Sequence, residues 1–244
     1  DDYDAAPIPR EGRGARFEES LRKLRELFKG ESLIEGVREI GPPPVRKGGP
    51  ELLLGANGRN ALRRVGEFTD GVLTWSFGAD PAEVRPMFDI VEASWRDFDR
   101  KGSPRLICSC YYAAGPKAAE DASNYFRDYY PGVLPGRVDE ILGAVRTVTP
   151  SAIRDAVRQF ADIGCDELIF VPIKPDIAHL DGLADIVIEI SLARLGQILK
   201  HFVDQNEKRP GIQRRGQLAP RRSRPTIGFE SWRGQGDRMS TVTT

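Results

Sequence analysis

The sequence predicts an α/β fold with a parallel sheet, made of four strand–helix units that correspond to half of a (β/α)8 barrel. Short apolar runs alternate with longer runs of helical period through most of the chain. The short runs lack the polar alternation of half-exposed strands, which is typical of parallel strands covered on both faces. No run approaches the roughly 18 apolar residues that a membrane span needs. A transmembrane role is therefore excluded.

The N-terminal part predicts one helix and a long extended connection. From Arg16 to Lys29 an apolar residue recurs every three or four positions, and Gly30 then ends the helix. The members of this apolar stripe are Phe17, Leu21, Leu24 and Phe28. The segment Glu31–Gly49 contains three consecutive prolines and several glycines, so we expect it to be extended.

The first two predicted strands flank a predicted helix. Glu51–Gly55 is a short apolar run, and a helix is expected from Gly58 to Phe68. The Asp70-Gly71 turn then leads into a second strand at Val72–Trp75.

The third unit begins with a strong helix-start signal, Asp80-Pro81-Ala82-Glu83, which combines an N-cap, a proline in the first turn and a capping-box glutamate. The helix is expected to end at Gly102, with Pro86 bending or fraying its first turns. A third strand is predicted at Leu106–Tyr112 and a helix at Pro116–Tyr129.

The fourth unit starts at Thr149-Pro150, which caps a helix that Gly164 stops. A fourth strand follows at Glu167–Pro172, and a last helix is expected at Ile186–Phe202. The stretch Tyr130–Arg146 gives no clear pattern beyond a weak helical tendency in its second half.

Composition indicates an ordinary globular protein with an unusual tail. The 244 residues include 36 Lys or Arg and 36 Asp or Glu, so the formal net charge is zero. Between Gln205 and Thr244, however, nine basic residues stand against three acidic ones. We predict a domain at residues 1–203 and a basic, disordered tail at 204–244, for which nucleic-acid binding is a minor alternative.

Three cysteines, an odd number, favour a reducing and therefore cytoplasmic compartment over a disulfide framework. The N-terminal residues carry acids and prolines and do not resemble a secretory signal. Because the chain starts with Asp1 and not with methionine, we also expect that a segment precedes it.

One loop stands out as a candidate binding site. Gly55, Ala56, Asn57 and Gly58 lie between the first strand and its helix, and ligands of parallel α/β folds bind beyond the carboxyl ends of strands. Backbone N–H groups in such a glycine loop can converge on a phosphate. The spacing matches neither the dinucleotide fingerprint nor the P-loop. A tight turn that needs glycine for backbone reasons explains the loop equally well.

Other chemically active residues have simpler explanations. Cys108 and Cys110 share one strand face, but no further cysteine pair or nearby histidine completes a metal site, so we predict no metal and two packed small residues. Cys165 is also expected to be packed. His179, a possible base, is expected to be an exposed loop residue. Trp75 is expected to be a core or wall residue, with stacking on a flat ligand as the alternative.

The order of these segments resembles the luciferase-like flavin-dependent oxidoreductases, the bacterial luciferase-like monooxygenase superfamily. Members are (β/α)8 barrels that bind FMN or a deazaflavin coenzyme. The resemblance covers roughly Asp2 to Ser191 and corresponds to the C-terminal half of the barrel. Its motifs lie at residues 2–5, 12–19, 21–31, 50–58, 61–62, 69–72 and 149–171.

The resemblance implies a flavoprotein oxidoreductase, a monooxygenase that acts on a small organic substrate with reduced flavin. It implies that Gly55, Ala56, Asn57 and Gly58 contact the cofactor phosphate, although Ala56 and Asn57 depart from the glycine or serine common in the family. A deazaflavin-dependent dehydrogenase or reductase is the alternative within this class.

The family's first four strands, which carry much of the ring pocket, have no counterpart here, so no catalytic residue is transferred. A half-barrel leaves two strand edges and an apolar face open. We therefore expect a homo-oligomer or a partner chain that completes the barrel, and a non-catalytic half-barrel is the alternative to an enzyme.

Overall fold

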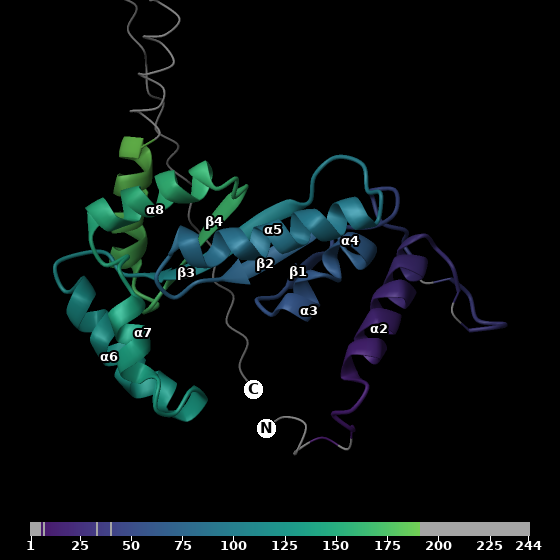
Figure 1. Ribbon diagram of the computed structural model, residues 1–244, viewed down its shortest axis with the longest axis horizontal. Coiled ribbons are helices and arrows are strands. Elements are labelled where there is room, and N and C mark those ends of the chain that lie inside the picture. Colours follow the sequence, from purple (N-terminus) through teal and green to yellow (C-terminus); the bar gives the residue numbers. More distant parts are fainter. Residues whose placement is uncertain (1–5, 7, 33, 40, 191–244) are drawn as a thin grey trace, which may run out of the picture. The chain divides into compact units, whose positions relative to one another are not determined.

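A computed structural model describes residues 6, 8–32, 34–39 and 41–190 (Figure 1). Its centre is a sheet of four parallel strands in the order β1-β2-β3-β4. The strands are β1 (Leu53–Gly55), β2 (Gly71–Trp75), β3 (Arg105–Tyr112) and β4 (Glu167–Pro172). Each strand begins and ends within two residues of its predicted position. The prediction of four parallel strand–helix units, half of a (β/α)8 barrel, is confirmed.

The helices are α2 (Arg13–Phe28), α3 (Arg59–Leu62), α4 (Val65–Phe68), α5 (Pro81–Asp97), α6 (Ala118–Val133), α7 (Val138–Ala144) and α8 (Pro150–Asp162). Residues 177–190 are also helical. Within the described residues, none of the helices is long and apolar enough to cross a membrane.

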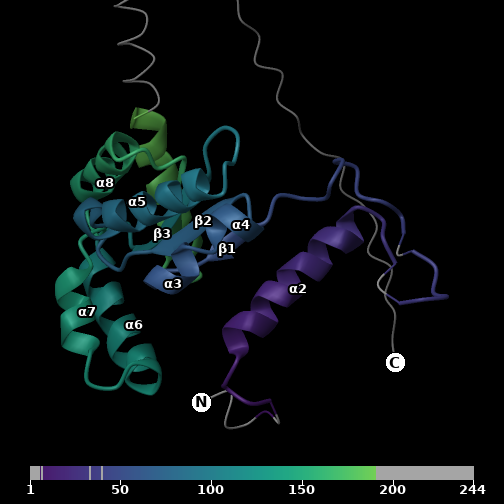
Figure 2. The same ribbon diagram turned by 45° about the vertical axis from the view of Figure 1, so that its right-hand side comes forward.

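One face of the sheet is covered by α5 and α8. The core on this side joins Val72 and Cys108 of the sheet to Phe88 of α5 and Phe160 of α8. Because side chains alternate along a strand, the neighbours of these core residues point to the opposite face, which would be the interior of a complete barrel. Figure 2 shows α6 and α7 together on the side of the sheet away from α5.

The capping signals of the sequence are confirmed. The Asp80 carboxylate accepts a hydrogen bond from the Ala82 N–H at 2.9 Å, and the Thr149 hydroxyl accepts one from the Ala152 N–H at 3.2 Å. Gly30 follows the end of α2 with a φ of 86°. Pro86 does not fray α5, which runs unbroken from Pro81.

The single helix expected from Gly58 to Phe68 is wrong, because the structure breaks it into α3 and α4. The Ser94 hydroxyl enters the break, donating to the Arg63 carbonyl at 2.6 Å and accepting from the Gly66 N–H at 3.1 Å. Gly66 permits this approach, since a Cβ there would lie 2.3 Å from the Ser94 carbonyl oxygen. A contact from a distant helix therefore replaces the local helical bonds.

The C-terminal elements also differ from expectation. The last helix begins at residue 177, nine residues before Ile186, and its expected continuation from 191 to 202 lies outside the described residues. The predicted domain boundary at 203/204 and the basic tail at 204–244 lie outside them as well. The unclear stretch Tyr130–Arg146 contains the end of α6 and all of α7.

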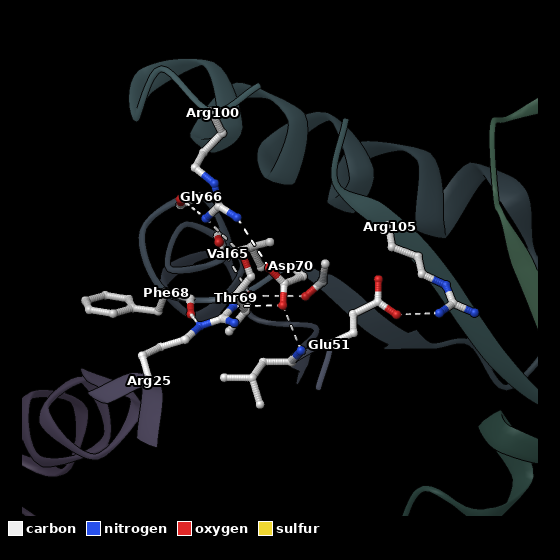
Figure 3. A network of polar contacts seen from close by, with 11 residues as sticks. Arg25, Glu51, Val65, Gly66, Phe68, Thr69, Asp70, Arg100 and Arg105 are labelled. Carbon is white, nitrogen blue, oxygen red and sulfur yellow. Dashed lines mark hydrogen bonds and ion pairs between the residues drawn. The ribbon is translucent and has the colours of Figure 1, made fainter. Parts of the chain in front are cut away.

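One carboxylate joins several elements at the amino end of the sheet (Figure 3). Asp70, immediately before β2, accepts hydrogen bonds from the Leu52 N–H at 2.9 Å and from Arg25 of α2 at 2.8 Å. Arg100, which follows α5, lies 3.5 Å from its second oxygen. The Asp70 backbone completes the junction, because its N–H donates to the Leu52 carbonyl and its carbonyl accepts from the Arg105 N–H.

This environment favours the charged form of the carboxylate. Burial by itself raises the pKa of an aspartate, but the Leu52 N–H and the Arg25 and Arg100 guanidinium groups outweigh burial. They hold the pKa of Asp70 below its ordinary value of 3.8.

We expect Asp70→Asn to lower the free energy of unfolding by about 1 to 3 kcal/mol near neutral pH, because the variant leaves Arg25 and Arg100 without their anionic partner. The stabilisation by Asp70 is fully present at pH values above 3.8, the ordinary pKa of an aspartate. It disappears as the pH falls through the lowered pKa of the folded state. Urea unfolding of both proteins as a function of pH measures this difference.

Asp128→Asn is the matched control. Asp128 is exposed on α6 and has no partner in the described part of the chain, so its loss should change stability by less than about 0.5 kcal/mol. A wild-type advantage over Asp70→Asn that persists unchanged into strong acid would contradict this account.

Candidate functional site

The carboxyl ends of the four strands meet at one edge of the sheet, as the parallel order requires. The loop after β1 lies there, followed by the loops after β2, β3 and β4. This is the edge at which parallel α/β folds bind ligands.

The loop after β1 runs beside β2 beyond the end of the strand ladder. The Ala56 N–H donates to the Leu73 carbonyl at 3.1 Å. The Asn57 amide then pairs with the backbone of Trp75, donating to its carbonyl at 2.7 Å and accepting from its N–H at 2.9 Å. The Asn57 side chain is thus occupied by the loop's own structure and fixes it against β2.

The backbone of this loop leaves a group of donors free. Among the hydrogen bonds of the described residues, none uses the N–H groups of residues 57–60. All four residues are exposed. Four consecutive N–H groups at the edge of the sheet are available to an anion.

The glycines of the loop are not explained by backbone strain. Gly58 has a φ of −80° and a ψ of 139°, and Gly55 likewise has no positive φ. A Cβ added to either glycine would meet no atom within 4 Å. The alternative that the turn needs glycine for its conformation is therefore wrong, and the glycines instead leave open space beside the free N–H groups.

The loop also carries a cation that was not predicted from the sequence. Arg59 is exposed and forms no ion pair or hydrogen bond through its side chain within the part of the chain that the structure describes. The signal in the sequence that could have indicated this cation is the position of Arg59 directly after Gly58. The helix that follows the loop adds little dipole, because α3 spans only Arg59–Leu62.

Trp75 forms a wall on the inner face of the sheet. Its ring meets Tyr111 of β3 edge-on at a centroid distance of 4.7 Å and Phe77 at 5.9 Å. The ring is partly exposed. The prediction of a wall residue agrees with this position.

Three tyrosines that were not predicted to meet, Tyr111, Tyr125 and Tyr130, form what we call the tyrosine cluster. The Tyr130 hydroxyl donates to the Tyr111 hydroxyl at 3.1 Å, and the Tyr111 and Tyr125 hydroxyls lie 3.3 Å apart. Burial raises the pKa of Tyr111 to about 12 and also raises the pKa of Tyr125 and of Tyr130. The only signal in the sequence was the recurrence of tyrosine at spacings of four and five on one helix.

His179 is buried, with an exposed fraction of 3%, so the prediction of an exposed loop residue is wrong. It lies in the first turn of helix 177–190, and its Nδ1 lies 2.7 Å from the Ala114 carbonyl and 3.1 Å from the Ala114 N–H. Its Nε2 lies 3.7 Å from Asp121 of α6. Gly182, one turn on, allows the helix to approach, since a Cβ there would be 2.9 Å from that of Ala114. His179 therefore ties helix 177–190 to the loop after β3.

The cysteines behave as packed residues. Cys108 and Cys110 are fully buried against α5 and α8, and burial raises the pKa of the Cys108 thiol to about 12. Cys165 is half-buried at the edge of the same core. No group of three metal-ligating side chains occurs in the residues described.

A cavity of about 420 Å³ opens at the same edge of the sheet, outside the strands. It is lined by the loop after β2, by Arg146 and Thr147 and by one side of α8. Ala79 in this loop has a φ of 48°, which is a strained conformation for a residue with a side chain. Because two aspartates, Asp80 and Asp155, share the lining with Arg146, the cavity is a weaker anion site than the loop after β1.

A sequence model described as luciferase-like monooxygenase matches residues 2–166, which is more than half of the chain. Among curated proteins, none matches this sequence.

Solved structures share the fold at low sequence identity. An F420-dependent secondary alcohol dehydrogenase in complex with an F420-acetone adduct has a TM-score of 0.59 and 12% identity, over 75% of this chain and 63% of that chain. Monooxygenase RslO1 from Streptomyces bottropensis has a TM-score of 0.55 and 14% identity, over 78% of this chain and 65% of that chain. EDTA monooxygenase from Chelativorans sp. BNC1 has a TM-score of 0.57 and 17% identity, over 79% of this chain and 62% of that chain. The chain thus spans less than two thirds of the length of each, and the likeness concerns the fold.

The position of His179 leads to a test of stability. We expect His179→Ala to lower the free energy of unfolding by about 1 to 3 kcal/mol, because the variant leaves the buried backbone of Ala114 without its partner. Urea unfolding measures this loss. Leu180→Ala, at an exposed position of the same helix, is the control and should cost less than about 0.5 kcal/mol. Equal losses in the two variants would show that His179 does not hold the helix.

Proposed function

The chain belongs to the luciferase-like monooxygenase family, and on this basis we propose that it is part of a flavin-dependent oxidoreductase that acts on a small organic molecule. A monooxygenase that uses FMN is the first candidate. A deazaflavin-dependent dehydrogenase is the second, because one of the similar structures is an F420-dependent alcohol dehydrogenase. The proposal places the reaction at the carboxyl edge of the sheet.

The proposal rests on the donors, the positive charge and the open space of the loop after β1. The N–H groups of residues 57–60 and the Arg59 side chain have no partner among the described residues, and they offer donors and a positive charge for a phosphate. Gly55 and Gly58 leave the space that a Cβ would fill. These features fit the phosphate of a flavin mononucleotide, and we assign its binding to Gly55, Ala56, Asn57, Gly58 and Arg59.

The roles within the loop differ. Asn57 positions the loop through its two bonds to the Trp75 backbone, and its own N–H remains free. Ala56 is buried and bonded to Leu73, so its contribution is to keep the loop in place.

A bound flavin supplies the redox chemistry, either hydride transfer or activation of dioxygen. The chain supplies binding, orientation and exclusion of water. Trp75 and Tyr111 form an aromatic wall on the inner face, next to residues 55–59, the proposed phosphate loop. Such a wall shields a reactive ring from solvent.

The inner face of the sheet supports a further part of the proposal, a partner that completes the barrel. Leu53, Leu73, Ile169 and Val171 point to this face, and each is at least partly exposed. In the described residues, β1 and β4 are the open edges of the sheet. A second copy of the chain, or another chain, would cover the face and both edges. A non-catalytic half-barrel remains the alternative function.

The phosphate loop is tested by FMN binding, followed by flavin fluorescence. We expect Gly58→Ala and Arg59→Gln each to weaken FMN binding about tenfold, since the first fills the open space and the second removes the cation. Because Gly58 has an ordinary φ, Gly58→Ala should leave stability unchanged within about 0.5 kcal/mol.

Riboflavin, which lacks the phosphate, is the chemical control and should bind weakly to all forms. Arg96→Gln removes an exposed arginine of α5 and should bind FMN like the wild type. Titration with coenzyme F420 in parallel decides between the two candidate cofactors. Equal affinity for riboflavin and FMN would reject the assignment of the loop.

Completion of the barrel is tested by size-exclusion chromatography with light scattering, in the presence of FMN. We expect flavin absorbance to elute with a species of about twice the 27.1 kDa of one chain, because two copies would cover each other's inner faces. A monomer that carries FMN would contradict assembly from two copies. An aggregate without flavin would favour the non-catalytic alternative.

A further inference from the structure

The tyrosine cluster lies where a substrate would meet the proposed cofactor. Tyr111 is the last but one residue of β3, and its side chain points to the inner face of the sheet. Its ring contacts Trp75, whose backbone is held by Asn57 of the phosphate loop. A continuous path of contacts therefore connects the phosphate loop to Tyr111.

One hydroxyl proton of the tyrosine cluster is not used in a hydrogen bond within the cluster. Three hydroxyls carry three protons, but only two hydrogen bonds join them. Tyr130 uses its proton on Tyr111, and the contact between Tyr111 and Tyr125 uses one more. The remaining proton, on Tyr111 or Tyr125, has no acceptor among the described residues.

The described side chains in ring contact with this donor are aromatic and uncharged. Phe77 and Phe126 contact the ring of Tyr111, and Tyr129 stacks on Tyr125 with an interplanar angle of 9°. Among the described residues, charged side chains form no hydrogen bond with any of the three hydroxyls. The raised pKa values keep the hydroxyls protonated at neutral pH, so that they act as donors.

We propose that the tyrosine cluster is the substrate-recognition site and that it binds a neutral aromatic compound through an oxygen atom that accepts the spare hydroxyl proton. This inference rests on the proposed function, because it takes the carboxyl edge as the reacting edge. The aromatic walls select a flat apolar body. In the part of the chain that the structure describes, the hydrogen bonds and ring contacts of the cluster include no cation. A carboxylate is therefore disfavoured, because its charge would lose hydration without gaining a counter-ion.

The test uses acetophenone as a neutral aromatic acceptor and benzoate as its charged counterpart, each titrated into the full chain by calorimetry. We expect acetophenone to bind at least about tenfold more tightly than benzoate, on the argument from charge just given. The double variant Tyr111→Phe/Tyr125→Phe should weaken acetophenone binding about fivefold to tenfold, because it removes both hydroxyls that can carry the spare proton. Either single variant leaves the other hydroxyl with a free proton and should weaken binding less.

Tyr129→Phe is the matched control, since Tyr129 lies on the same helix and contacts the cluster through its ring, while its hydroxyl forms no hydrogen bond among the described residues. It should change acetophenone binding less than about twofold. Thermal unfolding of every variant verifies the fold. Equal binding of acetophenone by all variants, no binding by the wild type, or preference for benzoate would each overturn the inference.

FMN titration of the same samples separates this inference from the proposed function. Binding of FMN that is unchanged in the double variant Tyr111→Phe/Tyr125→Phe, together with weakened acetophenone binding, supports both. Acetophenone binding that depends on the tyrosines in a chain that binds no flavin would reject the proposed function and leave the ligand class of the cluster intact. FMN binding without any acetophenone binding would reject the cluster as the recognition site.

Discussion

The pairing of β1 with β2 is the constraint on which the candidate site depends. The strand β1 is only three residues long, and its ladder runs from Leu53 opposite Gly71 to Gly55 opposite Leu73. A side chain fixes each end of this short pair. Asp70 holds the start of β1 through the Leu52 N–H, and Asn57 holds the chain after β1 through the backbone of Trp75. Since both clamps act across the same two strands, the register they fix also fixes where the loop with free N–H groups lies relative to the aromatic wall.

The sequence was sufficient for the features that local chemistry determines. The strands were found from apolar runs, and the starts of α5 and α8 from Asp80-Pro81 and Thr149-Pro150, because capping and proline effects act within one turn. The break between α3 and α4 was not predictable, since it depends on Ser94, which is 28 residues from Gly66. Burial of His179 likewise depends on a contact with Ala114, 65 residues away. The sequence predicts the loop at Gly55–Gly58. It does not predict which of the loop's N–H groups lack a partner among the described residues or the meeting of three tyrosines, because both depend on the three-dimensional arrangement of distant segments.

The amino and carboxyl ends of the sheet differ in how fully their polar groups are paired. At the amino end, the Asp70 network joins α2, β1, β2 and the segment after α5 through charge and hydrogen bonds. At the carboxyl end, N–H groups of the loop after β1 and one hydroxyl proton of the tyrosine cluster have no partner among the described residues, and Ala79 has a strained backbone. Stabilising contacts at one end and unsatisfied groups at the other are the arrangement expected of a (β/α)8 barrel, whose loops at the carboxyl face carry the chemistry.

Amide chemical shifts during titration with FMN test the central claim most directly, because they report on each N–H group of the phosphate loop. The account predicts that the amides of residues 57–60 shift together and saturate with FMN, while riboflavin leaves them in place. Shifts that instead gather around the loop after β2, near Ala79 and Arg146, would contradict the account and move the phosphate to the neighbouring cavity.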